Sequence, residues 1–336
     1  MNWIVKRTLV LFLTLAATVS INFFLIRLMP GNPVDILIRD YMLMGYSYEE
    51  AVNAVAAIVP FVPDKPIHEQ FIDYLKGILR GDLGKSITLA APVTVILGYG
   101  IPWTVFIVSI SLLTSFSLGV VLGIYAAYRR GGILDKGLSM FASVSGALPA
   151  YVVGVLFVLA FAVQLDWFPA YGTFGTLPGN PSAHVKPGFT LDFIVSVFYH
   201  AALPLLTYVT TTIGGWLLAM KSSTISALGE YYVTAAEARG LPERRIVLTY
   251  VGRNAVLPLF ARLAISLGYM FGGVVFIETI FSYRGIGSFL SHAIGVRDHT
   301  LMSGVFIVIS IAVVASNFAA DLLYSRLDPR IRLAAD

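Results

Sequence analysis

Two short stretches contain residue types that bind phosphate or metal, but neither has the spacing that such chemistry needs. Residues 81–86 read Gly-Asp-Leu-Gly-Lys-Ser, which matches the end of a P-loop, whose backbone N–H groups and Lys hold phosphates. A P-loop also needs Gly five residues before Gly84, where Leu79 stands. Residues 68–69, His-Glu, begin like the helix of a zinc protease, but Ile72 occupies the place of the second His. We therefore expect neither site.

The polar segment 221–253 is more typical of a docking function. It predicts two short helices, one from about Ile225 to Arg239 that ends at Gly240, and one that Pro242 opens. A helix–Gly–helix corner with many charges, between two apolar stretches, suggests contact with a soluble partner. The alternative is that the segment only connects its neighbours.

A third group of candidates lies within apolar stretches, where an ionisable side chain costs free energy. Glu278 is a candidate for a transport pathway or gate, with the alternative that it reaches water beyond the end of its helix. Arg262 and Asp321 stand near helix ends and are expected to reach water in this way. The aromatic candidates for the lining of a passage, each with ordinary packing as the alternative, are Tyr208, Trp216, Tyr269 and Phe271.

The composition requires a membrane around these residues. Of the 336 residues, 57% are hydrophobic and 12% are charged, whereas soluble domains have about 25% charged residues. The mean hydropathy is +0.81, so lipid must solvate apolar area that polar side chains cannot cover. The chain has no Cys and its five His show no ligand spacing, so we expect no metal site. The net charge of +4 is too small to indicate nucleic-acid binding.

Six apolar stretches are long enough to cross a hydrocarbon core of about 30 Å at about 1.5 Å per helical residue. They cover about 8–26, 102–128, 137–164, 200–220, 255–277 and 300–323. The first is interpreted as an uncleaved anchor, with a secretory signal as the alternative. The second is expected to begin at Pro102, which suits the first turn of a helix. The sequence thus predicts an all-α membrane protein with six transmembrane helices.

Most basic residues of the short connections fall on the side of both termini, and the connections on the other side contain only Lys186, Arg284 and Arg297. Because short cytoplasmic loops are rich in Lys and Arg, we expect both termini in the cytoplasm. The expected parts are an N-terminal transmembrane helix (1–29), an extracytoplasmic domain with an interfacial segment (30–100), and a five-helix core (101–336) with a cytoplasmic coupling loop (221–253). Within the outside domain, helices are expected to start at Ser47 and to cover 67–79.

Gly119 and Gly123 form a pair of small residues one helical turn apart in the second span. Such a pair lets two helices approach closely. We interpret it as packing within the chain, with a subunit interface as the alternative.

Several short motifs carry a resemblance to a known family. They are residues 27–33 (Arg-Leu-Met-Pro-Gly-Asn-Pro), 81–84 (Gly-Asp-Leu-Gly), 235–240 (Ala-Ala-Glu-Ala-Arg-Gly), 253–258 (Arg-Asn-Ala-Val-Leu-Pro), 278–281 (Glu-Thr-Ile-Phe), 284–287 (Arg-Gly-Ile-Gly) and 328–330 (Asp-Pro-Arg). In this order they resemble the permeases of binding-protein-dependent ABC importers, in the dipeptide, oligopeptide and nickel subfamily. Residues 235–240 are similar to the family's Glu-Ala-Ala-x-x-x-Gly loop. Thr234 replaces the leading Glu of that loop, so no salt bridge can form from this position.

The resemblance implies the type I ABC importer permease fold, in the cytoplasmic membrane of a prokaryote. It also implies a second homologous permease subunit, two cytoplasmic ABC ATPase subunits and an extracytoplasmic substrate-binding protein. ATP and Mg would then be bound by the partner ATPases, and this chain would bind no cofactor. The residues that the resemblance assigns to ATPase coupling are Thr234, Ala235, Ala236, Glu237, Arg239, Gly240 and Leu241.

Alternatives from other classes make different demands on the sequence. A membrane-embedded enzyme needs a cluster of acids, His or Ser within the spans, where only isolated ionisable residues occur. A self-sufficient secondary transporter or channel has no need of a docking segment like 221–253. We expect an importer of short peptides, with oligosaccharides as the alternative cargo. Nickel stays open because of Met140, Met220, Met270 and His200.

Overall fold

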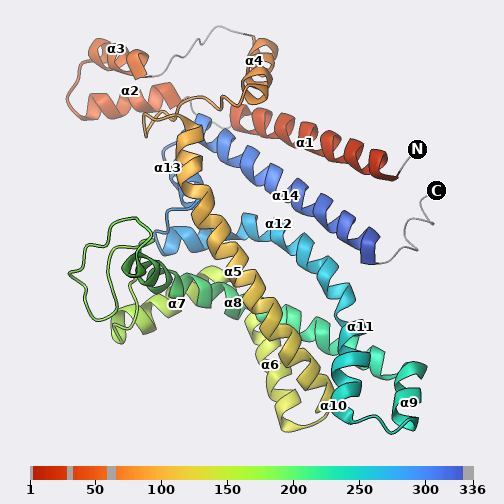
Figure 1. Cartoon of the computed structure of the whole chain (residues 1–336). Helices are drawn as coiled ribbons and strands as arrows, with labels where there is room; N and C mark the ends of the chain where they lie inside the picture. Colours follow the sequence, from red (N-terminus) through yellow and green to blue (C-terminus); the bar gives the residue numbers. More distant parts are fainter. Residues whose placement is uncertain (1–2, 29–32, 59–65, 328–336) are drawn as a thin grey trace.

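The computed structural model describes residues 3–28, 33–58 and 66–327, and their regular structure is helical (Figure 1). The long helices are α1 (Trp3–Leu28), α5 (Val93–Tyr128), α8 (Leu191–Leu228), α12 (Leu257–Ile280) and α14 (His299–Leu327). The shorter helices are α2 (Pro33–Leu43), α3 (Tyr48–Ile58), α4 (Ile67–Leu79), α6 (Ile133–Ala147), α7 (Ala150–Phe157), α9 (Tyr231–Ala238), α10 (Glu243–Arg245), α11 (Arg253–Ala255) and α13 (Ile286–Gly295). Two π-helical segments, η1 (Val158–Gln164) and η2 (Ile246–Gly252), follow α7 and α10. The expected all-α fold is confirmed.

Helices α1, α5, α8 and α14 are each long and apolar enough to cross a membrane. Two bent pairs, α6 with α7–η1 and α10–α11 with α12, pass the same test when each pair counts as one span. Counted in this way, the described residues contain the six expected spans. The bend between α6 and α7 is 102°, so the predicted continuous helix over 137–164 is wrong. Leu148 is extended (φ −82°, ψ 129°), because a proline ring, here that of Pro149, disfavours helical backbone at the residue before it.

Two long helices start earlier than the sequence predicted. α5 begins at Val93 and contains Pro102 in its interior, whereas a start at Pro102 was expected. α8 runs without interruption from Leu191 to Leu228, whereas a start near His200 was expected. The helix expected over 225–239 is therefore divided, because 225–228 belong to α8 and 231–238 form α9. A segment in lipid must satisfy its backbone hydrogen bonds internally. A helix that contains a proline loses one backbone hydrogen bond, whereas a non-helical segment in the same place would lose many, so the helix continues through the proline.

Helices α5 and α8 pack backbone to backbone. A Cβ atom on Gly123 would lie 2.7 Å from the carbonyl oxygen of Leu217 and 2.7 Å from Cβ of Met220. A Cβ on Gly119 would lie 3.1 Å from the backbone nitrogen of Leu217 and would overlap the Cβ of Trp216. Only glycine fits at these two positions without a shift of the helices. The prediction that this glycine pair serves packing within the chain is confirmed.

Helices α1 and α14 lie side by side and antiparallel (Figure 1). Asn22 Nδ2 donates to Ser310 Oγ over 3.4 Å. Near the other end of the pair, Arg7 of α1 and Phe318 of α14 border one small pocket. The beginning of α1 and the end of α14 therefore lie at the same end of the bundle.

The helices predicted between residues 30 and 100 are confirmed where the structure describes them. α4 covers Ile67–Leu79 as expected, and its Phe71 stacks on Phe24 of α1 with ring centroids 5.6 Å apart. At the start of α3, the Ser47 N–H donates to Glu50 Oε2 (2.9 Å), and the Glu50 N–H donates to Ser47 Oγ (3.3 Å). The bond from the Ser47 N–H holds the pKa of the Glu50 carboxyl below its usual value.

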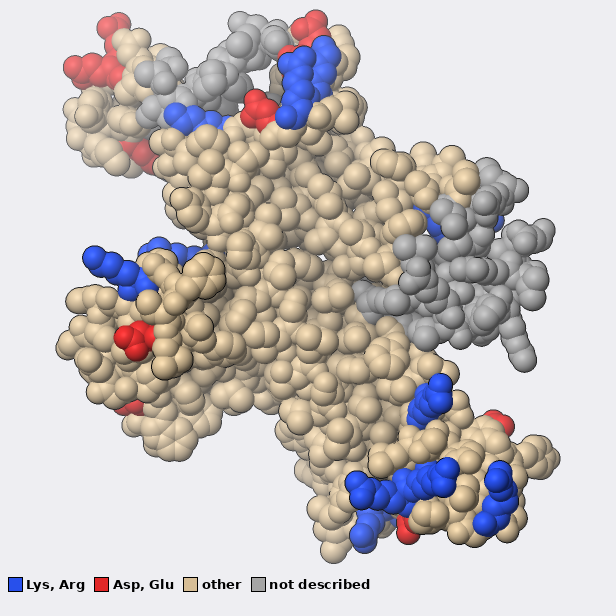
Figure 2. Space-filling model, in the orientation of Figure 1, with Lys and Arg blue, Asp and Glu red and all other residues tan. Residues whose placement is uncertain are grey.

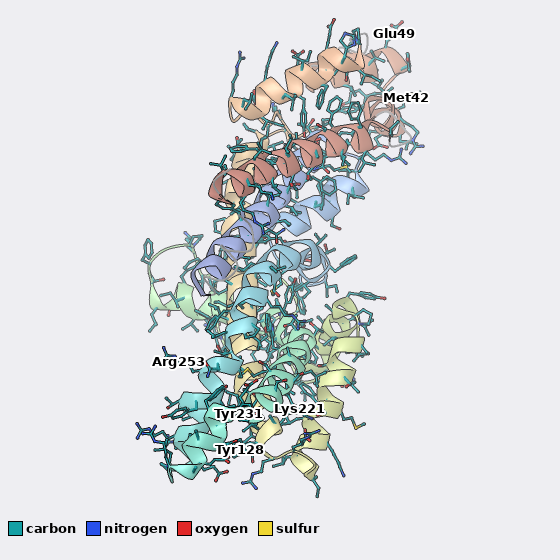
Figure 3. All side chains as sticks on the ribbon, turned by 90° about the vertical axis from the view of Figure 1, so that its right-hand side faces the viewer. Met42, Glu49, Tyr128, Lys221, Tyr231 and Arg253 are labelled. Carbon is teal, nitrogen blue, oxygen red and sulfur yellow. The ribbon has the colours of Figure 1, made fainter. Side chains whose placement is uncertain are left out.

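The two polar parts of the chain lie at opposite ends of the bundle. Met42 of α2 and Glu49 of α3 lie at the top of Figure 3, whereas Lys221, Tyr231 and Arg253 lie near its bottom. Between the two ends, Figure 2 shows a broad surface without charged side chains in the middle of the molecule, with charged side chains again at its left edge. This is the arrangement of charge that a protein crossing a hydrocarbon core requires.

The packing of α5 on α8 predicts a specific loss of stability for Gly123→Ala. The added methyl group must displace backbone atoms of α8, at a cost of about 1–3 kcal/mol. The matched control is Gly98→Ala in the same helix, where a Cβ meets no heavy atom within 4 Å. Thermal unfolding in detergent should show a lower midpoint for Gly123→Ala and no loss for the control. Equal midpoints for both variants would contradict the close contact.

Candidate functional site

The predicted Gly corner is present at the end of α9. The Gly240 N–H donates to the Glu237 carbonyl oxygen (2.8 Å), and the Leu241 N–H donates to the Ala236 carbonyl oxygen (3.3 Å). This pair of bonds is a Schellman motif, in which the first residue past the helix adopts a left-handed conformation. Gly240 has φ +67°, which glycine adopts without a steric penalty. The chain then enters α10 directly after Pro242, as the sequence predicted.

Helix α9 has one buried face and one exposed face. Val233 (1% exposed) and Ala236 (2% exposed) pack into the main hydrophobic core. Thr234, Ala235 and Ala238 are exposed, as is Tyr231 at the start of the helix. We call these four residues the α9 stripe, since their spacing of three and four places them along one side of the helix. Ala236 therefore packs inside its own chain and is not available to a partner, whereas Ala235 is.

The other predicted coupling residues surround the stripe. Glu237, Arg239 and Gly240 are exposed, and Leu241 is half-buried against the main core. Figure 2 shows Lys and Arg side chains gathered over this end of the molecule. Ser223 Oγ of α8 donates to the Ala255 carbonyl oxygen of α11 over 2.7 Å, so the two ends of the 221–253 loop are joined to each other.

An ion pair joins α6 to α8 at the same end. The Lys221 ammonium group pairs with the Asp135 carboxylate and donates to Ser139 Oγ (2.8 Å). The Gly131 N–H donates to the second Asp135 oxygen over 2.9 Å. These bonds hold the turn between α5 and α6 against α8.

Glu278, a candidate for the pathway or gate, lies at the opposite end and is fully buried. Its Oε1 accepts from Thr104 Oγ1 (2.6 Å), and its Oε2 accepts from the N–H groups of Gly287 (2.7 Å) and Ser288 (3.1 Å). The Ile286 N–H donates to Thr104 Oγ1 over 2.9 Å. Glu278 and Thr104 together satisfy the first N–H groups of α13, which have no partner within their own helix.

This capping explains why two of the sequence motifs occur together. A Cβ atom on Gly285 would overlap the Glu278 carboxylate, and a Cβ on Gly287 would lie 2.6 Å from Cα of Val275. The motifs at 278–281 and 284–287 therefore form one structural unit that joins α12, α5 and α13. The described contacts of Glu278 are those of a structural cap.

The aromatic candidates separate into two groups. Tyr208 and Trp216 of α8 line a cavity of about 430 Å³ beside α12, and the Tyr208 hydroxyl donates to the Met270 carbonyl oxygen (2.8 Å). Phe271 of α12 is half-buried and packs against both hydrophobic cores. Tyr269 is also in α12, but its side chain lies outside the described part of the structure.

No group of three or more His, Asp or Glu side chains that could hold a metal occurs among the described residues. His200 lies close to the oxygen atoms of other residues: its Nδ1 is 2.8 Å from the Ser196 carbonyl oxygen, and its Nε2 is 3.4 Å from Thr176 Oγ1. These contacts tie the loop before α8 to the helix. Nothing in this part of the chain favours metal chemistry.

The sequence reasoning missed two features. Asp298 accepts from Ser86 Oγ (2.6 Å) and Thr88 Oγ1 (3.0 Å) and from the Leu301 N–H at the start of α14 (3.0 Å). Its position directly before α14 is the signal of an N-cap. Arg262 is exposed, as expected of a side chain that reaches water, but the sequence did not predict that it also lines the cavity beside Trp216.

Comparison with known families decides among the classes of membrane protein. The family described as the binding-protein-dependent transport system inner membrane component matches residues 119–333. The chain belongs to this family. The matched region includes α8, the α9 corner, α12, α13 and the lining of the cavity except for Leu112.

Relatives of this permease match along nearly its whole length. The di/tripeptide transport system permease protein of Pseudomonas aeruginosa is 29% identical over 341 residues, which is 99% of both chains. The glutathione transport system permease protein of Pectobacterium atrosepticum is 27% identical over 338 residues, again 99% of both. The dipeptide transport system permease protein of Escherichia coli is 26% identical over 342 residues, 99% of both. These relatives are transport permeases rather than enzymes, and this permease is likewise a multi-pass membrane protein.

The cap on α13 gives a stability prediction for the permease. Glu278→Ala leaves the buried N–H of Gly287 and the partly buried N–H of Ser288 without an acceptor, at a cost of about 1–3 kcal/mol for a fully buried unsatisfied group. Glu278→Gln keeps one acceptor oxygen and should be milder. We expect the unfolding midpoint in detergent to fall in the order wild type, Gln, Ala. Thr279→Ala, which changes an exposed neighbour, should unfold like the wild type. A Glu278→Ala protein as stable as this control would contradict the capping role.

Proposed function

We propose that this chain is one of two homologous permease subunits of an ATP-driven importer for short peptides. The observation that carries the proposal is the full-length similarity to permeases named for di/tripeptide, dipeptide and glutathione transport. The other expected subunits are two cytoplasmic ABC ATPases, which bind ATP and Mg, and an extracytoplasmic substrate-binding protein. The permease itself binds no cofactor in this proposal and forms the passage through the lipid.

The α9 stripe is the proposed dock for one ATPase. Its exposed side chains are small at Thr234, Ala235 and Ala238, so another protein surface can approach the helix backbone closely. The charged side chains of Glu237 and Arg239 lie beside the stripe and would fix the orientation of the docked ATPase. Because Val233 and Ala236 belong to the main core, closure of the ATPases against the stripe would move the spans. Gly240 and Leu241 hold the angle of the corner.

The cargo follows from the relatives and from the charge of the cavity. Nickel is disfavoured because Arg262 places a positive charge in the cavity lining, where a metal cation would be repelled. An oligosaccharide remains the alternative cargo, since Trp216 is an aromatic surface of the kind on which a sugar could stack. A secondary transporter or channel would work without ATPases, and the coupling experiment below separates it from the proposal.

The proposed orientation places both termini and the 221–253 loop in the cytoplasm, and α2–α4 outside with the rest of residues 30–100. A cysteine at Glu49 or at Ser182, both exposed, should react with an impermeant thiol reagent on intact cells. A cysteine at the exposed Glu243 should react only after the cells are opened. The chain has no Cys of its own, so the signal is specific. Labelling of Glu243→Cys in intact cells would overturn the orientation.

The docking role predicts a loss of coupling for Ala235→Arg. The new side chain points away from the permease core, so the variant should still insert and fold, but it should obstruct a closely packed partner. We expect the ATPase rate stimulated by peptide-loaded binding protein to fall at least about tenfold, equivalent to about 1.4 kcal/mol. Ser182→Arg, which adds the same side chain at an exposed loop position on the other side of the membrane in the proposed orientation, should keep full stimulation. Full stimulation in Ala235→Arg would reduce the corner to a connector.

A further inference from the structure

The cavity beside α12 has the size and position of a transit site. It is bordered by α5, α6, α8 and α12, and its volume of about 430 Å³ falls within the roughly 300–1,000 Å³ of small-molecule sites. Its lining residues with polar or aromatic side chains are Tyr208, Thr211, Thr212, Trp216, Arg262 and Ser266. All of them belong to α8 or α12, two of the helices that form the spans.

Arg262 gives the cavity a permanent positive charge. It stands five residues after the start of α12, about 7.5 Å along the helix axis, and its guanidinium carbon lies 5.4 Å from the centroid of the Trp216 ring. None of the residues that line the cavity in the described structure is acidic. A guanidinium group stays charged and binds carboxylates through two parallel hydrogen bonds. The side chain is exposed within this chain, so a solute in the cavity can reach it, and an ionisable group in a spanning helix is typical of a pathway for polar cargo.

The hydroxyl groups of the lining complement this charge. Thr212 Oγ1 donates to the Tyr208 carbonyl oxygen (2.7 Å), Thr211 Oγ1 to that of Thr207 (2.9 Å), and Ser266 Oγ to that of Arg262 (2.8 Å). Because each hydroxyl hydrogen is used by its own helix, the oxygen atoms are left as acceptors. The lining therefore combines one strong cationic donor with several neutral acceptors.

We propose that Arg262 binds the free carboxylate of a peptide during its passage, above the Trp216 ring, while Thr211, Thr212 and Ser266 accept hydrogen bonds from its N–H groups. This assignment rests on the proposed peptide importer function and names the chemical group that the pathway recognises. A zwitterionic peptide offers both partners, whereas a neutral oligosaccharide has no carboxylate and a nickel ion is repelled.

The first test replaces the charge in the complete reconstituted complex. Uptake of a labelled dipeptide into proteoliposomes, driven by ATP and saturating binding protein, should fall at least about tenfold in Arg262→Gln. ATPase stimulation by loaded binding protein should persist, because the α9 stripe is intact. Arg262→Lys should be intermediate, since it keeps the charge but loses the paired bonds. Arg80→Gln, which removes an exposed charge at the end of α4, should transport at the wild-type rate.

A second pair of variants keeps Arg262 and fills the site instead. A Cβ atom on Gly215 would lie 3.7 Å from Arg262 Nη2 and would meet no other heavy atom within 4 Å. Gly215→Asp therefore places a tethered carboxylate beside the guanidinium group, and Gly215→Asn adds nearly the same bulk without charge. We expect uptake by the Asp variant to be at least about tenfold below that by the Asn variant.

The outcomes separate the two proposals. Wild-type uptake rates in Arg262→Gln, or equal rates in Gly215→Asp and Gly215→Asn, would overturn the carboxylate site and leave the peptide importer standing. Loss of the second permease from the Arg262→Gln complex would also overturn it, because Arg262 would then serve the subunit interface. A wild-type complex that accumulates no peptide at all would instead refute the proposed function.

Discussion

The fold depends on the direct contact between the backbones of α5 and α8. Gly119 and Gly123 let the two helices approach until only glycine fits between them. This contact fixes the position of Trp216 along the bundle, and Trp216 lines one side of the cavity. α8 continues as one helix to Leu228, three residues before the first residue of α9. Helix α8, which lines part of the cavity and leads through Gly229 and Glu230 to α9, is thus held in place by α5.

The two ends of the bundle are closed by different kinds of interaction. At the end that carries α13, a buried carboxylate, Glu278, satisfies the backbone donors of the next helix and admits only glycine beside it. At the α9 end, hydrophobic side chains of a short helix enter the main core, and polar bonds such as Ser223 to Ala255 hold the connection. The first arrangement is suited to rigidity, because a buried carboxylate without its partners is costly. The second leaves an exposed face free for a partner.

Features with a local cause were predictable from the sequence. The capping pair at Ser47 and the Gly240 corner follow from residue types at fixed offsets. The break at Pro149 was also readable, but the apolar pattern on both sides of it masked the signal. The orientation of Ala236 and the capping by Glu278 depend on which distant segments pack nearby, and no local pattern contains that information. The position of Arg262 beside Trp216 likewise depends on the packing of another helix, which the sequence does not show.

The most direct test of the account is a cysteine cross-linking scan along α9 in the assembled importer. The chain has no Cys, so single cysteines at Val233, Thr234, Ala235 and Ala236 report separately on each face of the helix. A short thiol cross-linker should join Thr234→Cys and Ala235→Cys to an ATPase subunit, and should leave the buried Val233→Cys and Ala236→Cys unlinked. Cross-links that ignore this alternation, or that do not form at either exposed position, would contradict the docking of an ATPase on the α9 stripe.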